Sequence, residues 1–282
     1  MHNTSASHIR PMCPGELGTA LQWAAREGWN PGLHDAACFY AADPQGFLVG
    51  LVGGEPIACI SVVRYGADYG FLGLYIVQPE YRGRGHGWAL WQAGMAHLGA
   101  RAVGLDGVVA QQANYRRSGF ALAHRNVRYQ GAARHGGGGG AVDLRTLDWQ
   151  QVLDCDRPCF PAGRAAFLHA WVHQDGHRAL GLMQGGRLAA YGVIRPCLQG
   201  YKIGPLIADD AAQAETLLRA LMACVPEGSA VFLDIPQPNA AAVVLAEGCG
   251  MAPVFETARM YKGASRLPDM QRTFGIGTFE LG

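Results

Sequence analysis

Apolar residues in the first half of the chain occur in two patterns. Continuous runs rich in β-branched and aromatic residues predict strands at residues 8–12, 47–52, 56–64, 71–77, 102–105 and 125–129. Apolar residues at helical spacing predict helices at residues 16–27, 35–41, 88–98 and 111–120. This order favours one compact α/β domain with a mixed sheet, which the strand at 125–129 closes.

A run of five glycines, residues 136–140, marks the clearest boundary in the sequence. Such a run sustains neither helix nor strand and typically forms a flexible joint. With 282 residues, the chain exceeds one domain of ordinary size. We therefore predict a first domain at residues 1–133, a glycine-rich linker at 134–141 and a second domain at 142–282.

Short segments of the second half repeat segments of the first at a spacing of roughly 130 residues. The matches pair residues 51–58 with 183–190, 62–64 with 193–195, 105–106 with 233–234, and 128–131 with 260–263. A fixed offset over several elements indicates an internal duplication. We expect two domains of similar fold in tandem.

The strand at residues 71–77 leads through Pro79 into a glycine-rich turn before the next helix. Proline cannot donate to a strand ladder and ends the strand there. The glycines of this turn are Gly83, Gly85 and Gly87. They let the backbone approach a ligand closely and direct N–H groups to one point, at a helix N-terminus that favours negative charge. Arg82 and Arg84 add cationic donors, so the turn predicts an anion site.

The run Val77-x-Pro79-x-Tyr81-Arg82-Gly83-x-Gly85-x-Gly87 resembles the acetyl-CoA motif of the GNAT superfamily of N-acetyltransferases. Together with the EGWNPG loop and the segments ARMYKG and FGIGTFELG, it resembles a two-domain bacterial GNAT subfamily over nearly the whole chain. The second half has GPLIADD at residues 204–210 in place of this motif, and two carboxylates there would repel phosphates. The resemblance therefore implies tandem GNAT-like domains, the first with the acetyl-CoA site and the second degenerate.

The resemblance also implies a mechanism, in which an acceptor amine attacks the thioester of acetyl-CoA directly, without a covalent enzyme intermediate. A backbone N–H near Ile76 or Val77 would stabilise the oxyanion. The implied cofactor-binding residues comprise the strand end that meets the pantetheine and the turn that meets the pyrophosphate: Tyr75, Ile76, Val77, Arg82, Gly83, Arg84, Gly85, His86 and Gly87.

Proton transfer requires an acid for the departing sulfur and a base for the amine. Tyr115, four residues before Gly119-Phe120, matches the family's general-acid position. Val108 stands where the family often has an asparagine, which puts that CoA contact in doubt. Glu27 and Asp106 are the candidate bases, although a solvated helix-end carboxylate and a turn cap are the alternative roles.

The loop at residues 28–32 contains Trp29 and Asn30 between two glycines and a proline. It is either a lip of the binding site or an ordinary connection between helices. Three histidines, His169, His173 and His177, have helical spacing but lack an accompanying carboxylate, so we predict no metal site.

The composition limits the partners and the compartment. A net charge of +1 gives no field for nucleic acid or an anionic membrane, and eight cysteines without a CxxC pair favour a reduced cytoplasmic setting. No apolar core of signal-peptide length and no run of about 18 apolar residues occurs. We expect a cytoplasmic monomer or homodimer that binds acetyl-CoA and an amine acceptor, with no nucleic acid or membrane partner.

The predicted function is an acetyl-CoA-dependent N-acetyltransferase acting on a small-molecule or peptide-like amine. A non-catalytic acyl-CoA-sensing or ligand-binding protein is an alternative. Binding alone would require Arg82 but not Tyr115, and the presence of both residues favours catalysis. A dinucleotide-dependent oxidoreductase is a further alternative, because Asp106 lies about twenty residues after the glycine turn. The GxGxxG spacing fails, since Trp88 or Leu90 stands at its third glycine.

Overall fold

The computed structural model describes residues 7–264 and 267–282, and the first half has every strand and helix that the sequence predicts. These elements are β1 (His8–Pro11), α1 (Leu17–Arg26), α2 (Asp35–Ala42), β2 (Phe47–Val52), β3 (Glu55–Tyr65), β4 (Tyr69–Val77), α3 (His86–Leu98), β5 (Ala102–Val108), α4 (Gln112–Arg117) and β6 (Ala121–Ala132). The glycine-rich residues 134–141 form neither helix nor strand.

The second half repeats the same order of elements. It contains β7 (Val142–Asp143), α5 (Trp149–Asp156), α6 (Ala165–His173), β8 (Arg178–Gln184), β9 (Arg187–Pro196), β10 (Tyr201–Ala208), α7 (Ala211–Met222), β11 (Ala230–Pro236), α8 (Ala240–Gly248), β12 (Ala252–Lys262) and β13 (Thr273–Gly275). The series β4, α3, β5, α4, β6 recurs as β10, α7, β11, α8, β12, as the duplication predicts. None of the helices in the described part is both long and apolar enough to cross a bilayer.

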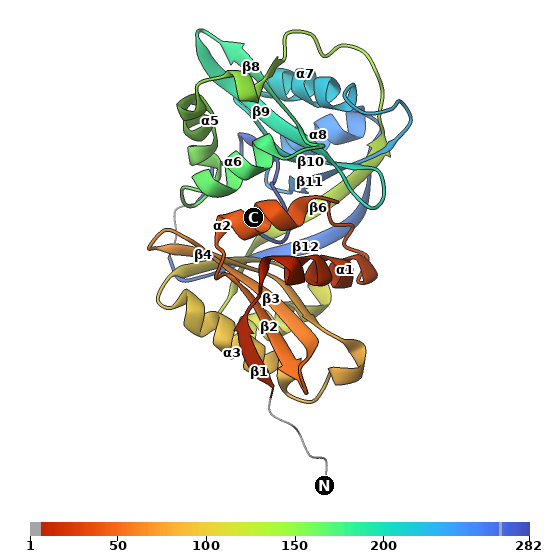
Figure 1. The fold of residues 1–282 in the computed structure, drawn as a ribbon. Helices are drawn as coiled ribbons and strands as arrows, with labels where there is room; N and C mark the ends of the chain where they lie inside the picture. Colours follow the sequence, from red (N-terminus) through yellow and green to blue (C-terminus); the bar gives the residue numbers. More distant parts are fainter. Residues whose placement is uncertain (1–6, 265–266) are drawn as a thin grey trace.

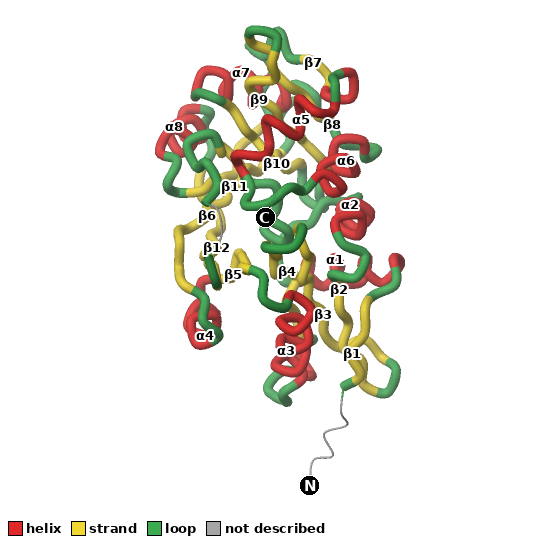
Figure 2. Tube along the Cα trace, turned by 90° about the vertical axis from the view of Figure 1, so that its left-hand side faces the viewer, coloured by secondary structure: helices red, strands yellow, loops and turns green. Residues whose placement is uncertain are grey.

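The strands form one continuous mixed sheet through both halves (Figure 1; strands yellow in Figure 2). Its order is β1-β2-β3-β4-β5-β12-β6-β11-β10-β9-β8-β7, with β13 beside β10. The strand predicted at residues 125–129 exists within β6, but the expectation that it closes the first domain is wrong. It pairs with β11 and β12, while β12 takes the place next to β5. Because the halves are similar, the closing strand of either half fits either sheet, and the chain exchanges them.

One buried ion pair joins each of the two exchanged strands to the other half. Arg128 of β6 donates to both carboxylate oxygens of Asp234 on β11, at 2.6 and 2.8 Å. Arg259 of β12 donates in the same way to Asp106 on β5, at 2.8 and 2.6 Å. In each pair the arginine lies directly opposite the aspartate in the register of the two strands. Losing one partner of such a pair would leave a buried charge uncompensated.

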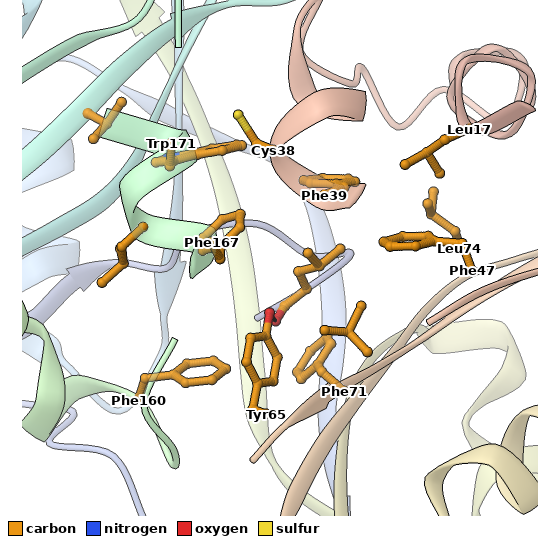
Figure 3. Close-up of a cluster of buried hydrophobic side chains, with 14 of the residues drawn as sticks. Leu17, Cys38, Phe39, Phe47, Tyr65, Phe71, Leu74, Phe160, Phe167 and Trp171 are labelled. Carbon is orange, nitrogen blue, oxygen red and sulfur yellow. Dashed lines mark hydrogen bonds between the residues drawn. The ribbon is translucent and has the colours of Figure 1, made fainter. Parts of the chain in front are cut away.

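An apolar cluster between the halves supplies further packing (Figure 3). Phe39 of α2 stacks on Trp171 of α6 with ring centroids 6.2 Å apart, and Phe160 packs edge-on against Tyr65 of β3 at 4.9 Å. All four side chains are buried. The cluster therefore packs the second half against the first beside β4.

Candidate active site

The site begins where the ladder between β4 and β5 stops. These parallel strands pair from Tyr69 with Ala102 to Leu72 with Leu105, yet both strands continue beyond that point. Leu74 has a φ of 45°, in the left-handed region that non-glycine residues rarely adopt. The register between β3 and β4 shifts at this position. We call the gap between residues 73–77 of β4 and 106–108 of β5 the wedge.

The wedge opens into a cavity of about 730 Å³, within the range of small-molecule sites. Nearly all the predicted site residues line it: Glu27, Tyr75, Ile76, Val77, Arg82, Gly83, Gly85, Gly87, Asp106 and Tyr115. A second cavity of about 420 Å³, lined by residues of α3 and α4, shares Tyr75 and Tyr115 with the first. Tyr115 therefore borders both cavities.

The turn before α3 has the geometry of an anion site. Gly83 and Gly85 have φ values of 74° and 85°, which glycine adopts without strain. Within the described chain, no acceptor takes a hydrogen bond from the backbone N–H groups of residues 83–88. These groups lie at the N-terminus of a 13-residue helix, where the helix dipole adds positive potential.

The charged residues of this turn have different environments. Arg82 lies at the cavity mouth, where its Nε donates to the Val77 carbonyl oxygen at 2.8 Å and its Nη2 donates to Glu27 at 2.5 Å. The Arg84 guanidinium lies over the Tyr81 ring, 5.8 Å from its centroid, and the buried His86 ring packs edge-on against the same ring. Arg84 and His86 are absent from the described lining of the cavity.

Tyr115 has an unpaired hydroxyl at the junction of the two cavities. Its ring stacks on Trp91 of α3 and packs closely against Gly107, where a Cβ would lie 2.2 Å from Tyr115 Cε2. Tyr115 accepts hydrogen bonds from Ser118 and Phe120 through its backbone carbonyl oxygen, and among the described residues none bonds to its hydroxyl. Burial raises the pKa of Tyr115 to about 12, and Tyr75 contributes to this rise. The phenol therefore stays protonated at neutral pH and can donate into the cavity.

The two predicted bases line the cavity but are already paired. Glu27 accepts from Arg82 at the rim, with 36% of its side chain exposed. Asp106 accepts from Arg259 through both oxygens and from Asn126 Nδ2 at 2.7 Å. Burial raises the pKa of Asp106, against the opposing effect of Arg259. In this geometry Asp106 holds two neighbouring side chains in place.

Four residues of the second half line the cavity, and no pattern in the sequence assigned them to the site. They come from β12 and from the segment after β13, and they are Phe255, Thr257, Phe279 and Glu280. Each lies more than a hundred residues from the glycine turn, and no local pattern connects them with it. The repeated ARMYKG segment marked β12 as a strand, but not as the neighbour of β5.

The loop at residues 28–32 serves as both a lip and a contact between the halves. Trp29 lines the cavity. Asn30 exchanges hydrogen bonds with Gln199 at 2.9 and 3.0 Å, and its carbonyl oxygen accepts from Lys202 Nζ at 3.0 Å. The loop therefore closes one side of the cavity while bound to the second half.

The three spaced histidines form no common site. His173 Nδ1 bonds to the carbonyl oxygen of His169 and His177 Nδ1 to that of Trp171. Across the part of the chain that the structure describes, no three His, Cys, Asp or Glu side chains are arranged to hold a metal ion.

The corresponding place in the second half differs. There β10 and β11 pair only from Tyr201 to Ile203, but β13 then pairs with β10 at Leu206 and Ile207 and lies in the gap. Asp210 caps α7 by accepting from the Gln213 N–H at 2.9 Å. In the second half, β13 thus occupies the position that corresponds to the wedge, and the Asp210 carboxylate occupies the position that corresponds to the anion site.

Comparisons with known proteins match both halves. A model described as an acetyltransferase (GNAT) family matches residues 16–120, and one described as an acetyltransferase (GNAT) domain matches residues 152–275. The chain is also 31% identical over 283 residues to the holothin acyltransferase of Pseudoalteromonas sp. (strain SANK 73390). That similarity covers 100% of this chain and 96% of the relative.

Solved structures have the same architecture. A putative acetyltransferase from Pyrococcus horikoshii superposes with a TM-score of 0.84 at 20% identity, covering 98% of this chain and 96% of that one. A tandem GNAT protein from the clavulanic acid biosynthesis pathway gives a TM-score of 0.61 at 16% identity, covering 93% and 99%. At these identities the similarity establishes the fold.

Proposed function

Since the chain belongs to the GNAT superfamily of acyltransferases, we propose that it transfers an acetyl group from acetyl-CoA directly to an amine. The observation that carries this proposal is a single cavity that joins unpaired helix-terminal N–H groups to an unpaired, protonated tyrosine. The first suits the phosphates of a CoA thioester, and the second suits its leaving sulfur.

The donor would lie along the wedge. The N–H groups of residues 83–88 and the Arg82 guanidinium would hold the pyrophosphate. Residues 75–77 of β4, which do not pair with β5, would form backbone hydrogen bonds with the pantetheine amides. A Cβ on Gly87 would lie 2.8 Å from Tyr75 Oη, so a larger residue there would displace the Tyr75 side chain. The thioester supplies the activated acyl carbon, and a backbone N–H near Ile76 would stabilise the oxyanion that forms on it.

Tyr115 would supply the proton for the departing thiolate. A phenol with a pKa of about 12 is a weak acid, but the same desolvation also raises the pKa of a thiol from its usual value of about 8.5. The same burial therefore raises the pKa of both the phenol and the thiol. A hydrogen bond from Tyr115 to the sulfur would strengthen as negative charge develops there.

We infer that the second half binds no acetyl-CoA of its own. The strand β13 lies in its gap, and a Cβ on Gly275 would be 2.5 Å from Leu233 Cδ1, so the packing there is tight. Asp210 places negative charge at the helix terminus where phosphate would bind. The second half instead supports the first site through β12 and the segment after β13.

An acceptor screen tests the proposal. The purified protein would be mixed with acetyl-CoA and a panel of alkyl amines, aryl amines, peptides and holothin, the acceptor named for the relative. Release of free CoA thiol and the mass of the product would be followed. We expect acceptor-dependent thiol release and a product heavier by one acetyl group. Thermal stabilisation by acetyl-CoA without turnover on any amine would refute amine acetylation, and faster turnover with a longer acyl-CoA would refute the acetyl preference.

A further inference from the structure

Glu280 is a buried carboxylate that faces the cavity and has no assigned role. Its side chain lines the cavity, although only 4% of the residue is exposed. Among residues 7–264 and 267–282, Glu280 forms hydrogen bonds through its backbone carbonyl oxygen and N–H, and none of them involves its carboxylate. A buried ionised group without a partner is costly, so such groups are rare outside functional sites.

The backbone around Glu280 is held firmly against β3 and β4. Ser61 Oγ donates to the Glu280 carbonyl oxygen at 3.2 Å, and Tyr65 Oη donates to that of Leu281 at 3.0 Å. The Thr278 hydroxyl accepts from the N–H groups of residues 280 and 281. This segment also lies so close to Gly73 that a Cβ there would be 2.2 Å from the Glu280 carbonyl oxygen. Glu280 is therefore fixed beside the bulge at which the wedge opens.

The charges around Glu280 leave it available for proton transfer. Burial raises the pKa of its carboxyl above the usual range, and Asp35 adds to the rise, while Lys202, Arg128 and Arg195 oppose it. Arg195 is engaged by Asp35 and Arg128 by Asp234. A carboxylate with a raised pKa is a better proton acceptor near neutral pH than an exposed one.

Three aromatic residues that line the cavity gather around Arg128, whose Nη1 donates to the Trp29 carbonyl oxygen and whose guanidinium lies over the Phe255 and Phe279 rings. Trp29, Phe255 and Phe279 come from three separate segments. The Arg128 guanidinium lies 4.7 Å from the Phe279 ring centroid and fixes that ring from behind. Among the described lining residues Arg82 is the sole cation, and it is paired with Glu27. The part of the cavity that these aromatic residues line suits a flat or apolar amine better than an anionic acceptor.

We propose that Glu280 takes the proton from the ammonium group of the acceptor, and that the acceptor is a small amine held between Trp29, Phe255 and Phe279. This inference rests on the proposed acetyl transfer and names its base and acceptor class. A carboxylate from the second half thereby completes a reaction centre whose donor site lies in the first half.

The proton and group transfers balance. Glu280 removes one proton from R–NH3⁺, the neutral nitrogen forms a bond to the thioester carbon, and the carbon–sulfur bond breaks. The second N–H proton ends on the CoA sulfur by way of Tyr115, which is regenerated. The products are the amide, CoA–SH and one proton, which Glu280 releases to solvent.

Two acceptors that differ in protonation test this role. Benzylamine is an ammonium ion at pH 7, whereas aniline is largely neutral and needs no base before attack. We expect Glu280→Gln to lower kcat/KM for benzylamine roughly 100-fold at pH 7 and for aniline by less than about 3-fold. In the variant, kcat/KM for benzylamine should rise about tenfold per pH unit as the free amine forms, while acetyl-CoA affinity stays unchanged.

The matched control is Glu256→Gln, an exposed glutamate on β12 beside two lining residues, which should stay within about twofold of the unchanged protein. If Glu280→Gln does not fold, Glu280→Asp provides the second test. It keeps the carboxylate and should still remove the proton from benzylamine at pH 7. Equal losses with benzylamine and aniline would overturn the role of Glu280 alone. Failure of the unchanged protein with both amines and with holothin would instead overturn the proposed function, and the inference with it.

Discussion

Replacement of Gly73 by alanine perturbs the contact between β4 and the segment that contains Glu280. The new Cβ would lie 2.2 Å from the Glu280 carbonyl oxygen and 2.9 Å from its Cα. Non-bonded heavy atoms prefer separations of about 3.5 Å or more. Because the obstructing atoms belong to the backbone, no change of rotamer relieves the overlap. Either β4 or the segment at residues 276–282 must move by roughly 1 Å.

The magnitude follows from that displacement. Overpacking of a well-filled interior costs about 1–3 kcal/mol, which for a chain of this size lowers Tm by roughly 2–10 °C. A displacement of about 1 Å at a reacting group lowers turnover roughly 100-fold. We therefore expect a less stable protein whose kcat/KM for an accepted amine falls strongly, while its affinity for acetyl-CoA changes little.

Calorimetric unfolding and steady-state thiol release measure the two effects. The matched control is Gly50→Ala on β2, where the nearest atom to a new Cβ is Ala58 Cβ at 3.7 Å, an ordinary contact. That variant should stay within about 0.5 kcal/mol of the unchanged protein. If Gly73→Ala matched Gly50→Ala in both stability and turnover, the close approach of Glu280 to β4 would be incorrect.

Three further predictions concern single side chains. Tyr115→Phe should lower kcat roughly 100-fold without changing acetyl-CoA affinity, and equal kcat values for the two proteins across the pH range would exclude it as the acid. Gly85→Ala should weaken acetyl-CoA binding, measured by calorimetry, because φ is 85° there; an unaltered Kd would contradict the anion site. Burial, reinforced by Arg195, lowers the pKa of His177 to about 4. Its contribution to stability is therefore complete above the unfolded pKa of about 6.5 and is lost as pH falls toward 4, by up to roughly 3 kcal/mol. The free energy of unfolding of His177→Gln, measured in urea, should change less with pH over that window. An unchanged pH dependence would show that His177 is not its origin.

The elements of the first half and the backbone geometry of the turn before α3 follow from local sequence. Apolar periodicity located the strands and helices of the first half, and the glycine turn identified the N–H groups of residues 83–88, because both depend on residues adjacent in the chain. The offset between matching segments likewise revealed the duplication. These features are set by local backbone preferences and need no knowledge of tertiary pairing.

Features that depend on pairing between distant parts of the chain could not be predicted from the sequence. Nothing local distinguishes whether β6 or β12 joins β5, since both strands present an arginine to an aspartate on the neighbouring strand. Asp106 was a reasonable base from its place at a strand end, but its partner Arg259 lies 153 residues away. Glu280 could not be assigned to the site, because its position depends on a contact with Gly73 across the whole fold.

The exchange of β6 and β12 has a consequence for how the protein is made. While the ribosome is translating the first half, β12, the neighbour of β5 in the complete fold, has not been made, and neither have β11 and β12, the two neighbours of β6. Translation must reach residue 262 before β12 can fill that place, and residue 280 before the last carboxylate arrives. The turn at residues 83–88 is thus synthesised early, but the complete lining of the cavity, which includes Glu280, exists only after nearly all of the polypeptide has emerged.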